Sequence, residues 1–134
     1  MSGRSFDWIQ YLRLAEELST RDEEECLRSS LSRAYYCIYN LALRRAEQNG
    51  FQRKQGESTH AQLWRLFSGS PESECIRLGQ IAIRLKDKRE RADYETHYRR
   101  IDEEVQQVLS DARSFVDKLG KLAPRHPNPN SVRQ

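Results

Sequence analysis

The sequence has little of several features that define common protein classes. It contains three cysteines, six glycines and four prolines among 134 residues. No apolar run approaches the ~20 residues that a membrane-spanning helix needs, and no hydrophobic leader follows Met1. Glycine-rich phosphate loops and the alternating pattern of strands are also missing. We therefore expect a cytoplasmic protein that does not bind membranes and is built without a sheet.

The cysteines argue against a disulfide framework. Their number is odd, and none of Cys26, Cys37 and Cys75 belongs to a Cys-x-x-Cys pair. Cys26 and Cys37 fall on one expected helix, about 16 Å apart at 1.5 Å per residue, which is too far for a bridge. A reduced protein follows, in which the thiols serve as small buried hydrophobes.

The histidines argue against a metal site. His60, His97 and His126 are scattered, and none stands near another His, Cys or carboxylate at metal-ligand spacing. No Ser-His-Asp or Cys-His nucleophile pattern is visible either. We expect no metal and no cofactor. His60 is interpreted as a helix-end or packing residue, and His126 as a tail residue without a specific role.

What the sequence does contain is helical periodicity in five stretches. The first begins after Ser5 as cap, and the second after a capping box from Thr20 to Glu23 that runs to Asn49-Gly50. A short third helix starts at Thr59, with Gln62 completing a second capping box. The residues expected to form the helix faces are Phe6, Ile9 and Leu12; Leu27, Leu31, Ala34, Tyr35, Ile38, Leu41 and Ala42; and Leu63, Trp64, Leu66 and Phe67.

The remaining two helices are expected after the Ser70-Pro71 start signal and from Ile101 to Leu119. Their expected core faces are Cys75, Ile76, Gly79, Ala82, Ile83 and Leu85, and then Ile101, Val105, Val108, Leu109, Ala112, Phe115, Val116 and Leu119. The fold prediction is all-α, an up-and-down bundle of four to five helices over residues 1–120. Three prolines and no apolar period predict a disordered C-terminal tail at 121–134.

Positive charge gathers near the end of the fourth expected helix. Between Arg84 and Arg100 there are seven basic and four acidic residues, an excess of three, which equals the net charge of the whole chain. Metal-free RNA cleavage needs a proton-transfer group and a cation for the phosphate, roles that suit His and Arg. His97 and Arg91 are the candidates, and Tyr94 could orient the site.

Helix geometry sets a condition on this site. Arg91 and His97 are six residues apart, about 600° around a continuous helix, so they do not share a face. They converge only if the helix ends near Tyr94 or if each faces a partner chain. The alternative is a solvated helix end, in which Arg89 or Arg91 pairs with a nearby acid and Tyr94 belongs to the core. For Tyr36 and Tyr39 two roles stay open: they line an RNA groove, or they form the margin of the core.

Four segments in order carry a family resemblance. "LSRAYYCIYNLALRRAEQNGF" at residues 31–51 resembles the signature helix of HEPN-domain proteins, in particular the small stand-alone UPF0332-like group. A Thr-His follows at 59–60, Arg-Glu-Arg-Ala-Asp-Tyr at 89–94, and Ala-Arg-Ser-Phe-Val at 112–116. The resemblance covers residues 6–119. It implies a HEPN-like helical domain that forms a homodimer.

The resemblance also implies a function. Many HEPN proteins are metal-independent endoribonucleases of toxin–antitoxin, CRISPR-linked or other defence systems, with an Arg, four to six residues and a His at the dimer interface. Arg91 and His97 fit this spacing, whereas alignment on Arg-x-x-Ala-Asp-Tyr makes Arg89 the family arginine and puts Tyr94 at the histidine position. Single-stranded RNA is the expected ligand, held by the residues Lys88, Arg89, Arg99, Arg100 and Tyr98.

A second reading treats the chain as a non-catalytic interaction module. In that case the helical dimer binds a protein partner, such as an antitoxin, a nucleotidyltransferase-like protein or another subunit of a defence complex. A third reading makes it a purely structural subunit, in which the basic helix end is incidental. The sequence leaves all three open.

Overall fold

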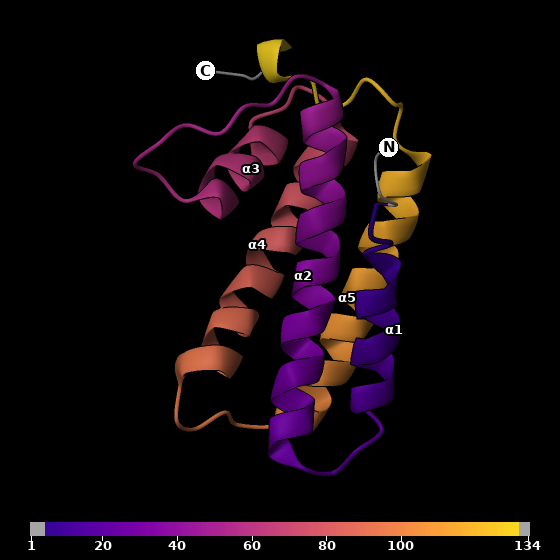
Figure 1. Cartoon of the computed structure of the whole chain (residues 1–134), viewed down its shortest axis with the longest axis vertical. Helices are drawn as coiled ribbons and strands as arrows, with labels where there is room; N and C mark the ends of the chain where they lie inside the picture. Colours follow the sequence, from indigo (N-terminus) through magenta and orange to yellow (C-terminus); the bar gives the residue numbers. More distant parts are fainter. Residues whose placement is uncertain (1–4, 132–134) are drawn as a thin grey trace.

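The structure, a computed structural model, describes residues 5–131. Within that range all regular structure is helical (Figure 1), which confirms the predicted all-α bundle. The elements are α1 (Ile9–Leu18), α2 (Glu24–Gln48), α3 (Thr59–Ser68), α4 (Ser73–Tyr94), α5 (Ile101–Lys121) and a short 3₁₀ turn, η1 (Pro129–Ser131).

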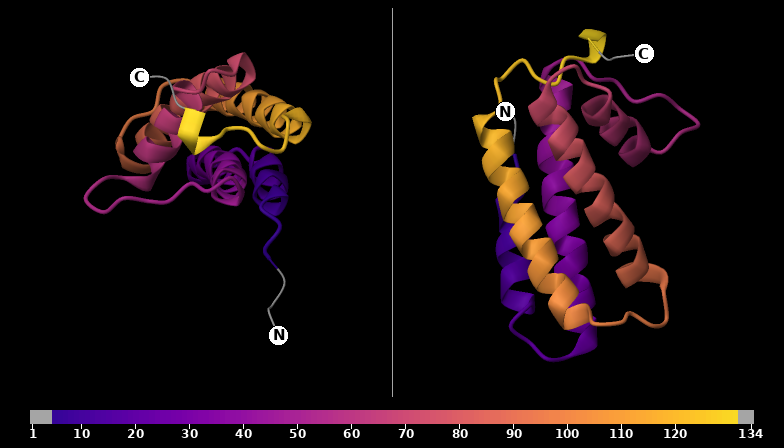
Figure 2. Two further views of the ribbon diagram at one scale, coloured as in Figure 1. Left: turned by 90° about the horizontal axis from the view of Figure 1, so that it is seen from above. Right: turned by 180° about the vertical axis from the view of Figure 1, so that it is seen from behind.

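Helices α1, α2, α4 and α5 run up and down beside one another, with α2 flanked by α1 on one side and α4 on the other (Figures 1 and 2). The α1–α2 and α4–α5 connections lie at one end of the bundle. The short helix α3, the 49–58 loop and the C-terminal segment lie at the opposite end. The chain therefore presents two distinct ends, and the basic segment identified in the sequence occupies the first.

The core is aromatic and aliphatic. Its largest fully buried side chains are Trp64, Tyr35, Phe67 and Phe115, joined by leucines and valines from α2, α4 and α5. The predicted face of α4 was wrong at one position: Ile83 is 48% exposed, and Leu78 is buried in its place. Leu78 lies three residues from both Cys75 and Ile81, so the true stripe is turned slightly from the one inferred.

The capping residues predicted for α1 and α2 are wrong. Thr20 does not cap α2, because its hydroxyl donates to the carbonyl of Glu17 at 2.7 Å and so closes the end of α1. Helix α2 begins at Glu24, and its first turn carries Glu24 and Glu25 near the positive end of the helix dipole. At α1, the Asp7 carboxylate accepts from the amide of Ile9 at 3.1 Å, whereas Ser5 makes no cap.

Helix α3 begins at Thr59, as predicted, but its cap differs from the predicted capping box. Ser58 is the N-cap and accepts from the amide of Ala61 at 3.4 Å. Gln62 completes no capping box. It is 5% exposed and bonds the amide and the carbonyl of Lys54, at 2.8 and 2.9 Å, and the carbonyl of Glu57 at 3.0 Å. The side chain of Gln62 thus tethers the 51–58 loop to α3.

The C-terminal segment after α5 was predicted to be disordered. In its described part, Leu122 is buried, and the Arg45 guanidinium donates to the carbonyls of Leu119, Ala123 and His126 at 2.9, 3.3 and 3.0 Å. Asn49 donates to the carbonyl of Pro127 at 3.3 Å. These contacts give residues 122–127 a defined path against the end of α2.

The thiols behave largely as expected. Cys37 and Cys75 are buried and Cys26 is half-buried, and all three are free. Burial raises the pKa of the Cys37 thiol to about 12. In the described part of the chain, no helix has the length and apolar content to cross a bilayer.

Candidate functional site

The basic end of the bundle is held in place from α2. Arg28 donates hydrogen bonds to the carbonyls of Ala92 and Thr96, at 2.9 and 3.1 Å, and its Nε lies 2.8 Å from Glu24. A cation at these last carbonyls satisfies groups that α4 leaves unpaired. Because α4 ends at Tyr94, Arg91 and the segment that includes His97 lie at the same end of the bundle. An end of the helix near Tyr94 is one of the two conditions under which Arg91 and His97, six residues apart, can converge.

Three of the predicted arginines meet at this end. Arg91, Arg99 and Arg100 line one open hollow, together with Glu103, Glu104 and Gln107. The Arg91 guanidinium carbon lies 4.7 Å from the centre of the Tyr98 ring, a cation–π distance. Tyr98 is buried, and burial raises the pKa of its phenol.

The turn that carries the hollow has an unusual backbone. Arg100, the residue before α5, has φ 57°, in the left-handed region that few L-residues occupy. Its guanidinium lies 3.9 Å from Glu103, and Arg91 lies 3.7 Å from Glu95. Both arginines therefore have exposed, weak carboxylate partners, of the kind that an incoming phosphate can replace.

The other predicted residues at this end are placed differently. Tyr94 is 80% exposed, so the alternative that made it a core aromatic is wrong. His97 is exposed, and within residues 5–131 its ring makes no hydrogen bond or ion pair. Lys88 lies 2.9 Å from Glu104 and links α4 to α5. It does not line the hollow.

Arg89 lies on the other side of α4 from the hollow. Residues two positions apart on an α-helix are separated by about 200° around its axis, so Arg89 and Arg91 point to nearly opposite sides of α4. Arg89 is 7% exposed, and its guanidinium carbon lies 5.2 and 5.3 Å from the ring centres of Tyr35 and Tyr36. Asp93 lies 3.6 Å from it, and its Nε has no hydrogen-bond partner. The two candidate arginines thus belong to different sites.

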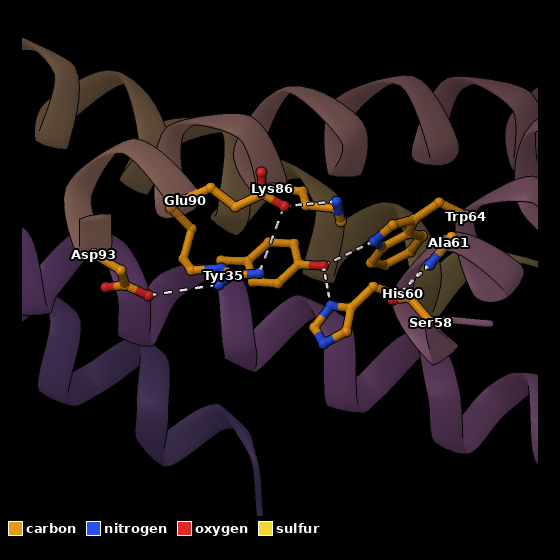
Figure 3. Close-up of polar contacts among 9 residues, drawn as sticks. Tyr35, Ser58, His60, Ala61, Trp64, Lys86, Glu90 and Asp93 are labelled. Atoms are coloured by element: carbon orange, nitrogen blue, oxygen red, sulfur yellow. Dashed lines mark hydrogen bonds and ion pairs between the residues drawn. The ribbon is translucent and has the colours of Figure 1, made fainter. Parts of the chain in front are cut away.

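The second site is centred on His60, which the sequence reading treated as a packing residue. The ring stacks on Tyr39, with centres 3.8 Å apart and planes at 9°, so it does pack. It is also hydrogen-bonded: Nδ1 lies 2.6 Å from the Tyr35 hydroxyl, which accepts from Trp64 Nε1 at 2.9 Å (Figure 3). His60, Tyr35 and Trp64 form one relay between α3 and α2.

This relay determines where the imidazole carries its proton. The Tyr35 hydroxyl has one hydrogen, and Trp64 can only donate to it. Within the described residues, His60 Nδ1 is the one acceptor within hydrogen-bond distance of that hydrogen, so we assign the hydroxyl as donor to Nδ1 and place the hydrogen of the neutral ring on Nε2. That Nε2–H has no partner within the described residues, and the ring is half-buried. His60 consequently offers a single, fixed donor to its surroundings.

The charges around His60 keep it neutral. The pKa of His60 is lowered to about 4, chiefly by burial and also by the cations Arg89 and Lys86, while Glu90 opposes them. Lys86 lies 2.7 Å from Glu90, and the pKa of the Glu90 carboxyl is lowered chiefly by this hydrogen bond. Burial also raises the pKa of the Tyr35 phenol. The site at neutral pH holds neutral rings beside cations.

Sequence reasoning missed the His60–Tyr35–Trp64 relay. Its members are 25 and 29 residues apart, and no spacing rule joins them. The usable signal was the Thr-His segment named in the family resemblance. Tyr39 is buried, which confirms its interpretation as margin of the core, and Tyr36 is half-buried and packs against the core with one part.

Comparisons with known proteins add no relative: no family model, curated protein or solved structure matches the chain. In residues 5–131, no group of three or more His, Cys, Asp or Glu side chains is arranged to hold a metal ion.

Proposed function

We propose that the protein binds single-stranded RNA and cleaves it as a homodimer, by metal-independent chemistry of the HEPN type. The observation that carries this proposal is the meeting of Arg91, Arg99 and Arg100 around one hollow, with Tyr98 under Arg91. A guanidinium group can bind two phosphate oxygens at once, and the buried Tyr98 ring supports that of Arg91 at a cation–π distance.

The roles follow from the chemistry of each group. A base removes the proton from the ribose 2′-hydroxyl, whose oxygen attacks phosphorus while the 5′-oxygen leaves and is protonated. His97 is the proton-transfer group, since imidazole titrates near neutral pH. Arg91 neutralises charge on the phosphate, Tyr94 donates a hydrogen bond that orients it, and Arg99 and Arg100 hold neighbouring phosphates.

A dimer supplies what one chain does not have. Each protomer contributes one imidazole at this end, whereas the reaction uses both a base and an acid. A two-fold axis near the α4–α5 turn doubles the imidazoles and encloses the arginines of both copies. The exposed ring of Tyr94, at 80%, and Ile83, at 48%, are on α4 and suit such a contact.

The test is a cleavage assay without metal. Purified protein should cut a single-stranded RNA in excess EDTA, leaving a 2′,3′-cyclic phosphate end. His97→Ala should reduce the rate at least about 100-fold, the scale of a general acid–base contribution. His126→Ala is the matched control, because this half-buried histidine belongs to the C-terminal segment held by Arg45, and that segment lies at the other end of the bundle (Figure 1). Wild-type rates in His97→Ala would remove His97 from the mechanism.

A second candidate function is a partner-binding module without catalysis. One observation favours it: the ring of His97 has no partner in the described chain that would orient it for proton transfer. In this case the exposed face of α4 binds a subunit such as an antitoxin, a nucleotidyltransferase-like protein or a defence-complex component. Recovery of a stable complex together with intact RNA after long incubation would favour this candidate.

A further inference from the structure

A continuous strip of aromatic and arginine side chains crosses α2 on a face separate from the basic hollow. It begins at Trp8, whose ring centre lies 5.1 Å from that of Tyr11. The Arg33 guanidinium carbon lies 4.9 Å from the Tyr11 ring centre and 5.7 Å from that of Tyr36. Rings and guanidinium groups therefore alternate along this surface.

The strip continues on the far side of Tyr36. The Arg89 guanidinium carbon lies 5.3 Å from the Tyr36 ring centre, and the His60 ring lies 6.0 Å from it at 80°. Six residues, Trp8, Tyr11, Arg33, Tyr36, His60 and Arg89, thus form what we call the aromatic–arginine strip. It joins the segment before α1 to α2, α3 and α4, which lie side by side in Figure 1.

Most residues of the strip are partly exposed to solvent. All of its members except Arg89 are half-buried, so part of each side chain or its backbone remains accessible. Phe6, 45% exposed, packs edge-on against Trp8 at 4.8 Å and extends the aromatic surface. Arg89, at 7% exposure, lies beneath Tyr36 and fixes its ring from below.

The positive charge and the aromatic rings of the strip suit an anionic ligand that carries planar rings. Arg33 has no carboxylate partner within residues 5–131, and the strip itself contains no acid. Asp93 and Glu90 accompany Arg89 at one end, at 3.6 and 4.0 Å. His60 adds its outward Nε2–H donor. A ligand that alternates planar bases with phosphates matches this alternation of rings and donors.

We propose that the aromatic–arginine strip is a second contact surface for single-stranded RNA, on which bases stack against Tyr11 and Tyr36 while Arg33 and His60 bind phosphates. The inference rests on the proposed RNA function and adds a path for the strand outside the cleavage end. A second copy of the chain is a poorer occupant, because a two-fold contact here would bury two unpaired Arg33 groups with no acid of the strip to neutralise them.

The experiment measures both affinity and position. A fluorescent single-stranded RNA of about 12 nucleotides, within the range that such surfaces span, is titrated with the full chain in EDTA. Its sugars are 2′-O-methylated, so that the 2′-oxygen cannot attack and the strand stays intact. Arg33→Ala should weaken binding about tenfold, the scale of one lost hydrogen bond between charged groups. Arg13→Ala is the matched control, since Arg13 is exposed on α1 about 200° from Tyr11.

Photo-crosslinking of the wild type with 4-thiouridine in the same strand tests the strip without any mutation. Crosslinks at Trp8, Tyr11 or Tyr36, with weakened binding in Arg33→Ala alone, support the inference. Crosslinks confined to residues 91–100, with equal affinities for both variants, overturn the inference and leave the proposed function standing. A wild type that does not bind RNA overturns both. A dimer that dissociates in Arg33→Ala overturns the inference by making this face the dimer contact.

Discussion

Tyr35 and His60 lie 25 residues apart in sequence and share a hydrogen bond of 2.6 Å that fixes the tautomer of the imidazole. The same hydroxyl accepts from Trp64 at 2.9 Å. One oxygen thus satisfies a buried indole and orients a half-buried histidine. The bond leaves the Nε2–H of His60 as a donor near the cations Arg89 and Lys86 of α4. This site lies on the opposite side of α4 from the basic hollow.

Removal of this hydroxyl should be costly. In Tyr35→Phe, the Trp64 Nε1–H loses the acceptor that it has among the described residues, at a site where the indole is 2% exposed. A buried donor without a partner costs about 1–3 kcal/mol, so the free energy of unfolding should fall by that amount in urea titrations. Tyr94→Phe is the control: its hydroxyl belongs to an 80% exposed side chain, and it should change stability by less than about 0.5 kcal/mol. Equal stability of the two variants would contradict the relay.

Stability should depend on pH through His60. Its pKa is about 4 in the folded protein and about 6.5 in an unfolded chain. Between these values the unfolded state binds more protons, so this contribution is complete above about pH 6.5 and is lost as pH falls toward 4. Arg89 and Lys86 add to the effect, and Glu90 opposes it.

The measurement is the free energy of unfolding across that window in three proteins. His60→Gln should lose the slope between pH 4 and 6.5, whereas His97→Gln should keep it because His60 is intact. Because the pKa of Glu90 is lowered from its ordinary value of 4.5, the contribution of that carboxyl is lost only at the acid edge of the window and below it. A wild-type slope that survives in His60→Gln would show that another group is responsible.

Two glycines should respond in opposite directions to the same substitution. A Cβ at Gly79 would lie 2.6 Å from Ser68 Oγ and 3.0 Å from Ser68 N, so Gly79→Ala forces α3 and α4 apart. We expect a loss of about 1–3 kcal/mol. Gly120, in α5, has open space around it, and Gly120→Ala should raise stability by up to about 1 kcal/mol through helix propensity. Thermal unfolding of both variants checks the contrast, which two changes of equal sign would refute.

The C-terminal segment should depend on one arginine. Arg45→Ala removes the donor to the carbonyls of Leu119, Ala123 and His126. Amide exchange and proteolysis of residues 122–131 should then accelerate, while the helices stay protected. Arg44→Ala is the neighbouring control, because Arg44 is exposed and makes none of these bonds. Similar protection of the segment in both variants would argue that Arg45 does not hold it.

The sequence was a good guide to helices and a poor guide to their ends. The five periodic stretches correspond to the five helices because burial of an apolar stripe decides where a helix forms. Capping is decided by local competition, and the Thr20 hydroxyl bonds back to Glu17. The prediction for the tail depended on its prolines and could not include Arg45, whose bonds cross 74 to 81 residues.

The candidate site was predictable only in part. The gathering of Arg91, Arg99 and Arg100 follows from their closeness in sequence, on either side of the end of α4. The separation of Arg89 from Arg91 also follows from the helical period, once the buried face of α4 is known. The His60 relay depends on the packing of α3 against α2, which no periodicity in one segment contains.

The central claim, that the α4–α5 end grips the phosphates of RNA, is tested most directly by the salt dependence of binding. Each phosphate neutralised on a single strand contributes about −0.7 to the slope of log K against log salt. The double variant Arg99→Ala, Arg100→Ala should therefore bind more weakly and show a slope less steep by about 1.4 than that of the wild type. An unchanged slope, or a wild type that binds no RNA at low salt, would contradict the account.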